Sequence, residues 1–138
     1  MSYRELVIVI SVLFFSCSPR TQLALNSSYE NTKATDTYVL IPNGALVDSY
    51  QIIENNIEYT VGVVNGRIKY VSTFDKDFTV GGLRINDLLP KSFSNRQWGY
   101  RPGWGYYIEL DAGWYAGFDF KTKPTEESRI QWFFKYEF

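Results

Sequence analysis

The dipeptide Asn65-Gly66 constrains the fold of this chain more than any other feature. Both residue types accept the positive φ angles of a type I′ turn, and runs of alternating apolar residues flank them over residues 57–64 and 67–74. A two-residue turn of this kind predicts a β-hairpin whose register is set from the turn outward. The pairs expected on its apolar face are Val63 with Ile68, Val61 with Tyr70, Tyr59 with Ser72, and Ile57 with Phe74.

A second hairpin is predicted around residues 111–113, a loop of sequence Asp-Ala-Gly with glycine at the left-handed position. The chain then ends on apolar residues at every second position from Ile130 to Phe138, which predicts a last strand. The sheet is therefore expected to be mostly antiparallel. The pairs expected on the apolar face of the second hairpin are Leu110 with Trp114, Ile108 with Ala116, Tyr106 with Phe118, and Trp104 with Phe120.

Two segments carry helical signals. Residues 86–90 favour a short helix capped by Asn86 or Asp87 and shortened by Pro90. The other segment has an i, i+4, i+7 spacing at Leu46, Tyr50 and Ile53, which suggests a second helix. A strand over residues 49–53 is the alternative for this segment. The fold class predicted is thus α+β: an antiparallel sheet of two hairpins plus a C-terminal strand, with one or two short helices on one face.

The N-terminus has the layout of an export signal. Arg4 precedes an apolar stretch over residues 6–15, which is too short for the roughly 20 residues that span a bilayer as a helix. The only cysteine, Cys17, follows directly, with Ser16 before it. This order resembles the bacterial lipobox, which implies cleavage before Cys17 and acylation of its thiol and of its new amino group. An ordinary secretory signal with an incidental cysteine is the alternative.

The domain organisation follows from this signal. Residues 1–16 are expected to be a lipoprotein signal peptide, and residues 17–36 the lipidated cysteine with a polar, flexible tether. Residues 37–138 are long enough for a single folded domain. With Cys17 acylated, no cysteine remains for a disulfide, so the fold has to rest on packing.

The segment between the two hairpins carries a second resemblance. A Ser-Thr-x-Asp strand end at residues 72–75 is followed by Gly-Leu-Arg-Ile-Asn-Asp at residues 82–87. This pattern resembles small bacterial envelope lipoproteins of the β-lactamase-inhibitor-protein-like and small protein A types. The resemblance implies a Gram-negative cell envelope and a layout of helices on one face of an antiparallel sheet. Ser18, where an inner-membrane lipoprotein usually has aspartate, implies the outer membrane.

Most catalytic chemistry is excluded by composition. The chain has no histidine, which argues against zinc sites and against Ser-His-Asp or Cys-His catalysis, and it has no Gly-rich phosphate loop. No cofactor is expected. Asp75 and Asp77 lack the other ligands of a calcium loop, so no metal site is predicted. The 14 basic and 15 acidic residues nearly balance, which gives no case for a nucleic-acid partner. An enzyme that relies on Asp or Glu alone ranks last among the functions.

The aromatic segment from Trp98 onward is the candidate binding surface. Trp98, Tyr100 and Tyr107 are expected to expose their rings beside Arg101, whereas Trp104 and Trp132 are expected to be buried. Exposed aromatic rings suit a protein partner or the face of a sugar. The alternative is that Trp104, Tyr106, Phe118 and Trp132 are core residues and that the other rings pack over the second face of the sheet.

Together these features predict a lipid-anchored envelope domain that acts by binding and not by catalysis. Its expected location is the outer membrane, facing the periplasm. A protein partner is favoured, in an inhibitor, immunity or envelope-assembly role. The second hypothesis is a carbohydrate-binding module that stacks sugars on Trp98, Tyr100 and Tyr107.

The anchor can be tested by changing Cys17 to alanine. The lipid on this thiol is the one anchor that the sequence indicates, so Cys17→Ala is expected to release the domain from the membrane or to leave an unprocessed precursor. Cell fractionation and the size of the product on a gel measure both outcomes. A processed variant that still fractionates with the outer membrane would contradict the lipoprotein assignment.

Overall fold

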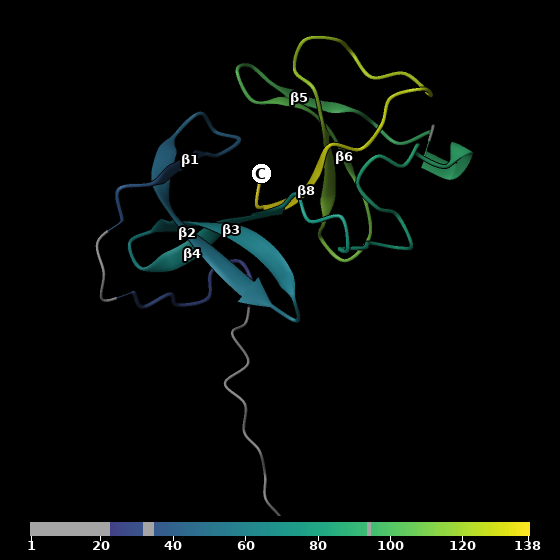
Figure 1. Cartoon of the computed structure of the whole chain (residues 1–138). Helices are drawn as coiled ribbons and strands as arrows, with labels where there is room; N and C mark the ends of the chain where they lie inside the picture. Colours follow the sequence, from purple (N-terminus) through teal and green to yellow (C-terminus); the bar gives the residue numbers. More distant parts are fainter. Residues whose placement is uncertain (1–22, 32–34, 94) are drawn as a thin grey trace, which may run out of the picture.

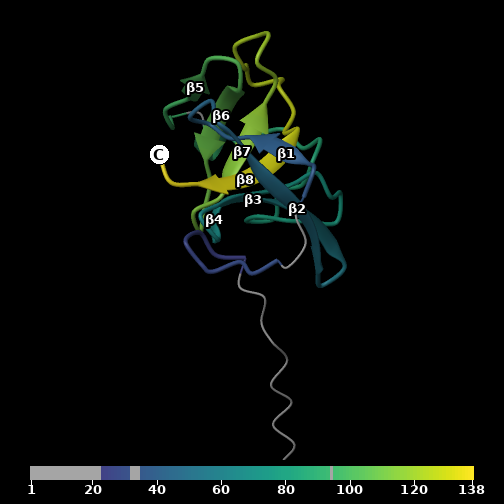
Figure 2. The same ribbon diagram turned by 90° about the vertical axis from the view of Figure 1, so that its left-hand side faces the viewer.

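The protein forms one curled antiparallel sheet. The computed structural model describes residues 23–31, 35–93 and 95–138, so the predicted signal peptide and Cys17 lie outside the described residues. Eight strands make a single sheet shaped like a half-barrel (Figures 1 and 2). The strands are β1 (Tyr38–Leu40), β2 (Leu46–Glu54), β3 (Ile57–Val64), β4 (Arg67–Thr73), β5 (Gly99–Arg101), β6 (Gly105–Glu109), β7 (Tyr115–Phe118) and β8 (Trp132–Tyr136).

The strand order places the last strand in the middle of the sheet. It runs β1-β2-β3-β4-β8-β7-β6-β5, so two four-stranded meanders meet where β4 pairs with β8. Every neighbouring pair is antiparallel, as the sequence predicts. Because β8 is central, it is covered on both faces, and its neighbouring residues Phe133 and Phe134 both have 0% exposure.

The α+β prediction is wrong, because no α-helix occurs among the described residues. The segment expected to form the first helix is β2, in which Val47 and Ser49 are buried at the two-residue period of a strand. Leu46 and Ile53 are 70% and 74% exposed. Their helical spacing therefore marks residues on the surface and not a stripe that faces a core.

The second predicted helix is also absent. Asn86 has a φ of 72°, and its backbone N–H donates to the carbonyl of Ile130 at 2.8 Å. The N–H of Ile130 donates in turn to the carbonyl of Asp87 at 3.0 Å. The backbone groups that a helix would have used are therefore bonded to the chain just before β8. A single turn of 3-10 helix, η1 (Lys91–Phe93), follows Pro90.

The first hairpin has the predicted turn but a shifted register. Asn65 and Gly66 have φ angles of 51° and 70°, and Val63 pairs with Ile68 as expected. The register then slips by one residue, so that Gly62 and not Val61 lies opposite Tyr70. A β-bulge of this kind sends every later side chain of one strand to the other face. Tyr70 accordingly packs on the face opposite to the predicted one.

The second hairpin has the predicted register, except at its open end. Tyr106 pairs with Phe118, and Ile108 pairs with Ala116. The expected pair of Trp104 with Phe120 does not form, because β6 begins at Gly105, whose φ of 137° redirects the chain. Trp104 instead lies on the opposite face, where its indole Nε1 donates to the carbonyl of Leu40 at 3.2 Å. This bond links the turn between β5 and β6 to the end of β1.

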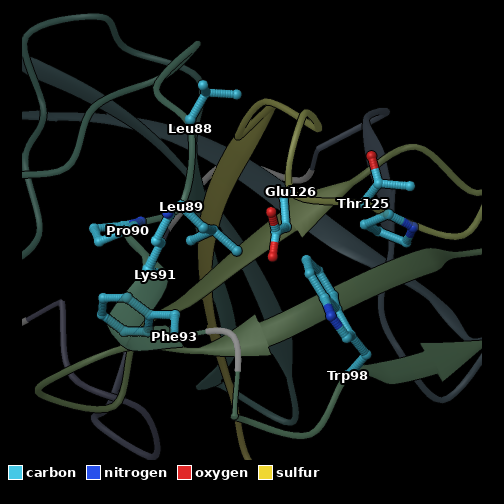
Figure 3. Close-up of a pocket in the computed structure, with 9 residues that line it drawn as sticks. Leu88, Leu89, Pro90, Lys91, Phe93, Trp98, Thr125 and Glu126 are labelled. Atoms are coloured by element: carbon cyan, nitrogen blue, oxygen red, sulfur yellow. The ribbon is translucent and has the colours of Figure 1, made fainter.

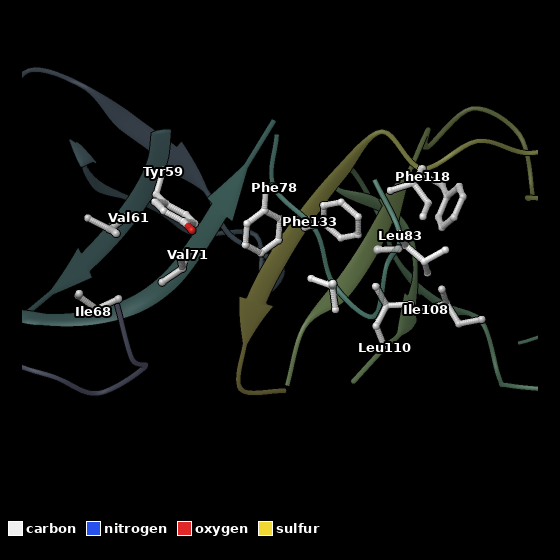
Figure 4. Close-up of a cluster of buried hydrophobic side chains, with 13 residues drawn as sticks. Tyr59, Val61, Ile68, Val71, Phe78, Leu83, Ile108, Leu110, Phe118 and Phe133 are labelled. Atoms are coloured by element: carbon white, nitrogen blue, oxygen red, sulfur yellow. The ribbon is translucent and has the colours of Figure 1, made fainter. Parts of the chain in front are cut away.

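The first face of the sheet holds the larger core. The connection between β4 and β5 crosses this face and buries Phe78, Val80 and Leu83. Phe78 lies in the middle of the cluster, with its ring centroid 5.5 Å from that of Phe133 (Figure 4). Part of the segment assigned to the tether also packs here, through Leu23, Leu25 and Tyr29. The other buried members are Tyr59, Val61, Ile68, Val71, Ile108, Leu110, Ala116, Phe118 and Ile130.

The second face is lined by aromatic rings that lie over glycines. A Cβ atom on Gly117 would come within 2.1 Å of the Trp132 ring, and one on Gly99 would come equally close to the Tyr107 ring. A side chain at either glycine would therefore displace the ring above it. The buried members of this aromatic face are Ile41, Val47, Tyr70, Trp104 and Phe134.

Adding one methyl group at Gly117 tests this arrangement. Gly117→Ala is expected to lower the free energy of unfolding by about 1–3 kcal/mol, because Trp132 has to move. Chemical denaturation measures the loss. Trp132→Leu in the same background removes the clashing ring and is expected to make the double variant less destabilised than the sum of the two single variants. Strict additivity would contradict the contact.

Tyr70 gives the fold a dependence on alkaline pH. Burial raises the pKa of Tyr70 to about 12, although hydrogen bonds with the side chains of Ser72 and Trp132 lower it. The unfolded chain loses this proton near pH 10 while the folded chain keeps it. Below pH 10 Tyr70 is protonated in both states, so its contribution to the free energy of unfolding is fully present. As the pH rises toward 12 the free energy of unfolding falls by about 2–3 kcal/mol, because only the unfolded chain loses the proton. Unfolding of Tyr70→Phe should show a shallower loss over that range, and an unchanged slope would contradict the assignment.

Candidate functional site

The four predicted binding residues divide between the two faces of the sheet. Trp98 and Tyr100 lie on the first face, at the edge formed by β5. The Trp98 ring packs edge-on against Phe118, with centroids 4.9 Å apart, and is half-buried. Tyr100 lies 4.5 Å from the ring of Tyr106 and is 46% exposed. Of the three predicted aromatic rings, Tyr100 is the one that is exposed.

Tyr107 and Arg101 lie on the second face, beside the C-terminal residue. The Tyr107 ring stacks on Phe138 at 4.5 Å and 10°, and it is half-buried. The guanidinium of Arg101 lies 5.5 Å above the same Phe138 ring. Trp104 is buried as predicted, whereas Trp132 is half-buried. The predicted residues therefore do not form one continuous platform.

A pocket of about 370 Å³ opens beside Trp98. We call it the Trp98 pocket. Leucine and proline residues at the end of the β4–β5 connection form one side, and the β7–β8 connection forms the other (Figure 3). Glu126 and Trp98 lie across the pocket from Leu89 and Phe93 in this view. The lining residues are Leu88, Leu89, Pro90, Lys91, Phe93, Trp98, Pro124, Thr125 and Glu126.

Arg96 holds the η1 side of the pocket in place. Its guanidinium lies 4.3 Å over the Phe93 ring, and its Nη1 donates to the carbonyl of Glu109 at 2.7 Å. Its Nη2 also lies 3.7 Å from a carboxylate oxygen of Asp111. Both ends of this ion pair are exposed, so its contribution to stability is small. The guanidinium thus ties the pocket wall to the end of β6 mainly by its stacking and its hydrogen bond.

The opposite wall is held by a turn within the β7–β8 connection. The backbone N–H of Thr125 donates to the Ser128 hydroxyl at 2.8 Å, and the N–H of Ser128 donates to the Thr125 carbonyl at 3.0 Å. These two bonds position Glu126 at the pocket. One acidic side chain and one basic side chain, Glu126 and Lys91, accompany an otherwise mostly apolar lining. Such a lining suits an apolar group with a polar end.

Sequence reasoning found Trp98 but missed the rest of this pocket. Leu88 and Leu89 belong to the segment expected to form a short helix, whereas in the structure they line the pocket and Leu88 is 44% exposed. Pro124 lies between charged residues of the β7–β8 connection, where no sequence pattern indicates a site, and it is buried. Their proximity depends on the bridge between Leu88 and Arg129, a contact between distant segments that no local pattern indicates. In the described part of the chain, no three acidic, cysteine or histidine side chains cluster as metal ligands would.

No protein-family model, curated protein or solved structure matches this chain. None of the helices among the described residues has the length and apolar character needed to cross a membrane.

Proposed function

We propose that this chain is a lipid-anchored protein of the bacterial envelope that binds a protein partner through the Trp98 pocket. The observation that carries the proposal is an open pocket whose lining is mostly leucine, proline and aromatic side chains. Apolar surface of this kind is costly in water unless a partner covers it. An exposed leucine, Leu88, extends the apolar surface at the pocket.

The pocket has the properties of an interface anchor site. Binding energy at protein interfaces concentrates in a few apolar or aromatic side chains that fill preformed pockets. Here the walls are held before binding by Arg96 on one side and by the Thr125–Ser128 turn on the other. A preformed pocket loses less conformational entropy when it is filled. Glu126 is placed to bind a polar or cationic group at the end of the inserted side chain.

The proposed anchor places the domain close to the membrane. Leu23 already packs against the first face of the sheet, and residues 18–22 separate it from Cys17. Even fully extended, this segment reaches only about 20 Å. A lipid on Cys17 would therefore favour a partner that lies in or at the same membrane.

A photo-crosslinking experiment in cells tests the proposed site. A photoreactive amino acid in place of Leu88, which is 44% exposed, is expected to form a discrete adduct with an envelope protein. Trp98→Ala in the same chain is expected to remove that adduct, and Trp98→Phe is expected to retain most of it. The adduct is measured by a shift in size on a gel and identified by mass spectrometry.

Leu46 provides the matched control, because it is a leucine with 70% exposure on β2, in the other meander. A crosslinker there should not give the same adduct. Cooperative unfolding of the purified Trp98→Ala variant establishes that the domain still folds. The proposal is wrong if the Leu88 adduct survives in folded Trp98→Ala, or if Leu46 gives the same product.

A further inference from the structure

A second open site lies on the aromatic face, away from the Trp98 pocket. Two hollows of about 340 Å³ and 210 Å³ share Thr60 and Phe74 in their walls. We call them together the Phe74 groove. The larger hollow alone is within the range of small-molecule sites, roughly 300–1,000 Å³. The larger hollow is lined mainly by aromatic and aliphatic side chains, and the smaller one mainly by polar side chains, including the carboxylates of Glu58 and Asp75.

The floor of the groove is aromatic and held in place. Tyr70 and Trp104 are 3% and 9% exposed. The phenol oxygen of Tyr70 shares hydrogen bonds with the side chains of Ser72 and Trp132, and the Trp104 indole donates to the carbonyl of Leu40. The polar atoms of these rings therefore have partners within the protein. These two rings form a rigid floor, and the aromatic surface that a ligand can reach is that of Phe74 and Trp132.

Phe74 stands in the wall with much of its ring free. It stacks on Trp132 at 6.1 Å and 27°, yet it remains 66% exposed. One side of the ring is thus covered by the indole, and the other side is available to a ligand. A phenylalanine placed in this way is a surface on which a flat, partly apolar ring can lie.

Polar side chains without positive charge complete the groove. The Gln51 amide and the Thr60 hydroxyl bond to each other at 2.9 Å and 3.1 Å. The Asp75 carboxylate accepts the backbone N–H groups of Asp77 and Glu58, which holds the pKa of Asp75 below its usual value. No lysine or arginine is among the lining residues of the groove. An anionic ligand would therefore find no counter-charge.

We propose that the Phe74 groove binds a neutral oligosaccharide. A pyranose ring presents a C–H face, which packs on aromatic rings, and an edge of hydroxyl groups, which bond to amides, hydroxyls and carboxylates. The groove supplies both: aromatic faces at Phe74 and Trp132, and donors and acceptors at Gln51, Thr60 and Gln131. This site is independent of the proposed protein partner, because it lies on the other face of the sheet.

Titration with three neutral tetrasaccharides tests the proposal: the β-linked tetramer of N-acetylglucosamine, maltotetraose and cellotetraose. The full mature lipoprotein is used in a polyoxyethylene detergent, since detergents with sugar head groups would compete. Trp104 and Trp132 line the groove, so tryptophan fluorescence reports occupancy. At least one tetrasaccharide is expected to give a saturable change at millimolar concentration or below, with little dependence on salt.

Single substitutions then locate the site. Phe74→Ala is expected to weaken binding about tenfold, and Gln51→Leu about threefold to tenfold, because one removes the stacking surface and the other the amide. Tyr38→Ala is the matched control: Tyr38 is 62% exposed, close to the 66% of Phe74, but it lies one residue before Val39 on β1 and so points to the opposite face. The affinity of the Tyr38→Ala variant for the sugar should be unchanged.

The proposal is overturned if none of the three sugars gives a saturable signal, or if Tyr38→Ala weakens binding as much as Phe74→Ala. It is also overturned if 1-dodecanol displaces the sugar and Gln51→Leu binds 1-dodecanol more tightly than the unsubstituted protein does, since the groove would then prefer an apolar chain. Trp98→Ala should leave sugar affinity unchanged. The sugar site and the proposed protein site can therefore fail separately.

Discussion

The pairing of β4 with β8 is the contact on which the rest of this structure depends. Tyr70, Ser72 and their neighbours bond to the last strand of the chain, which joins two four-stranded meanders into one sheet. Without this pairing each meander would end in an unpaired edge, and exposed edges favour association with other chains. The pairing also requires the chain to leave β4, build β5 to β7 and return. The connection that results, over residues 74–98, supplies the covering layer of the first face.

The two faces of the sheet are closed by different means. On the first face, Phe78 and its neighbours fill the space over Phe133, and the Trp98 pocket opens where this cover meets the β7–β8 connection. On the second face no such layer is present among the described residues, and aromatic rings lie over glycines instead. The bond from Trp104 to Leu40 draws one end of β1 toward the β5–β6 turn. The Phe74 groove lies beside that closure and stays open.

The two sites differ in chemistry as well as in position. The Trp98 pocket is lined mainly by leucine, proline and aromatic residues, with one charge of each sign. The Phe74 groove combines aromatic rings with amides, hydroxyls and two carboxylates, and has no basic side chain in its lining. An apolar pocket suits the side chain of a protein, and a mixed groove suits a hydroxylated ring. The proposals of a protein partner and a sugar ligand therefore concern separate surfaces of one domain.

By itself, the sequence determined the features that depend on local backbone preference. Asn65-Gly66 and the loop at residues 111–113 specify their turns through positive φ angles, and the residue pairs nearest these turns form as predicted. Tertiary structure decided the rest. Tyr70 changed face because its own strand, β4, carries one extra residue between Ile68 and Tyr70. Leu46 to Ile53 became a strand because pairing with β3 satisfies its backbone. Trp98 and Tyr107, close in sequence, were sent to opposite faces. Burial and strand pairing depend on partners many residues away, and no local pattern encodes where those partners will lie.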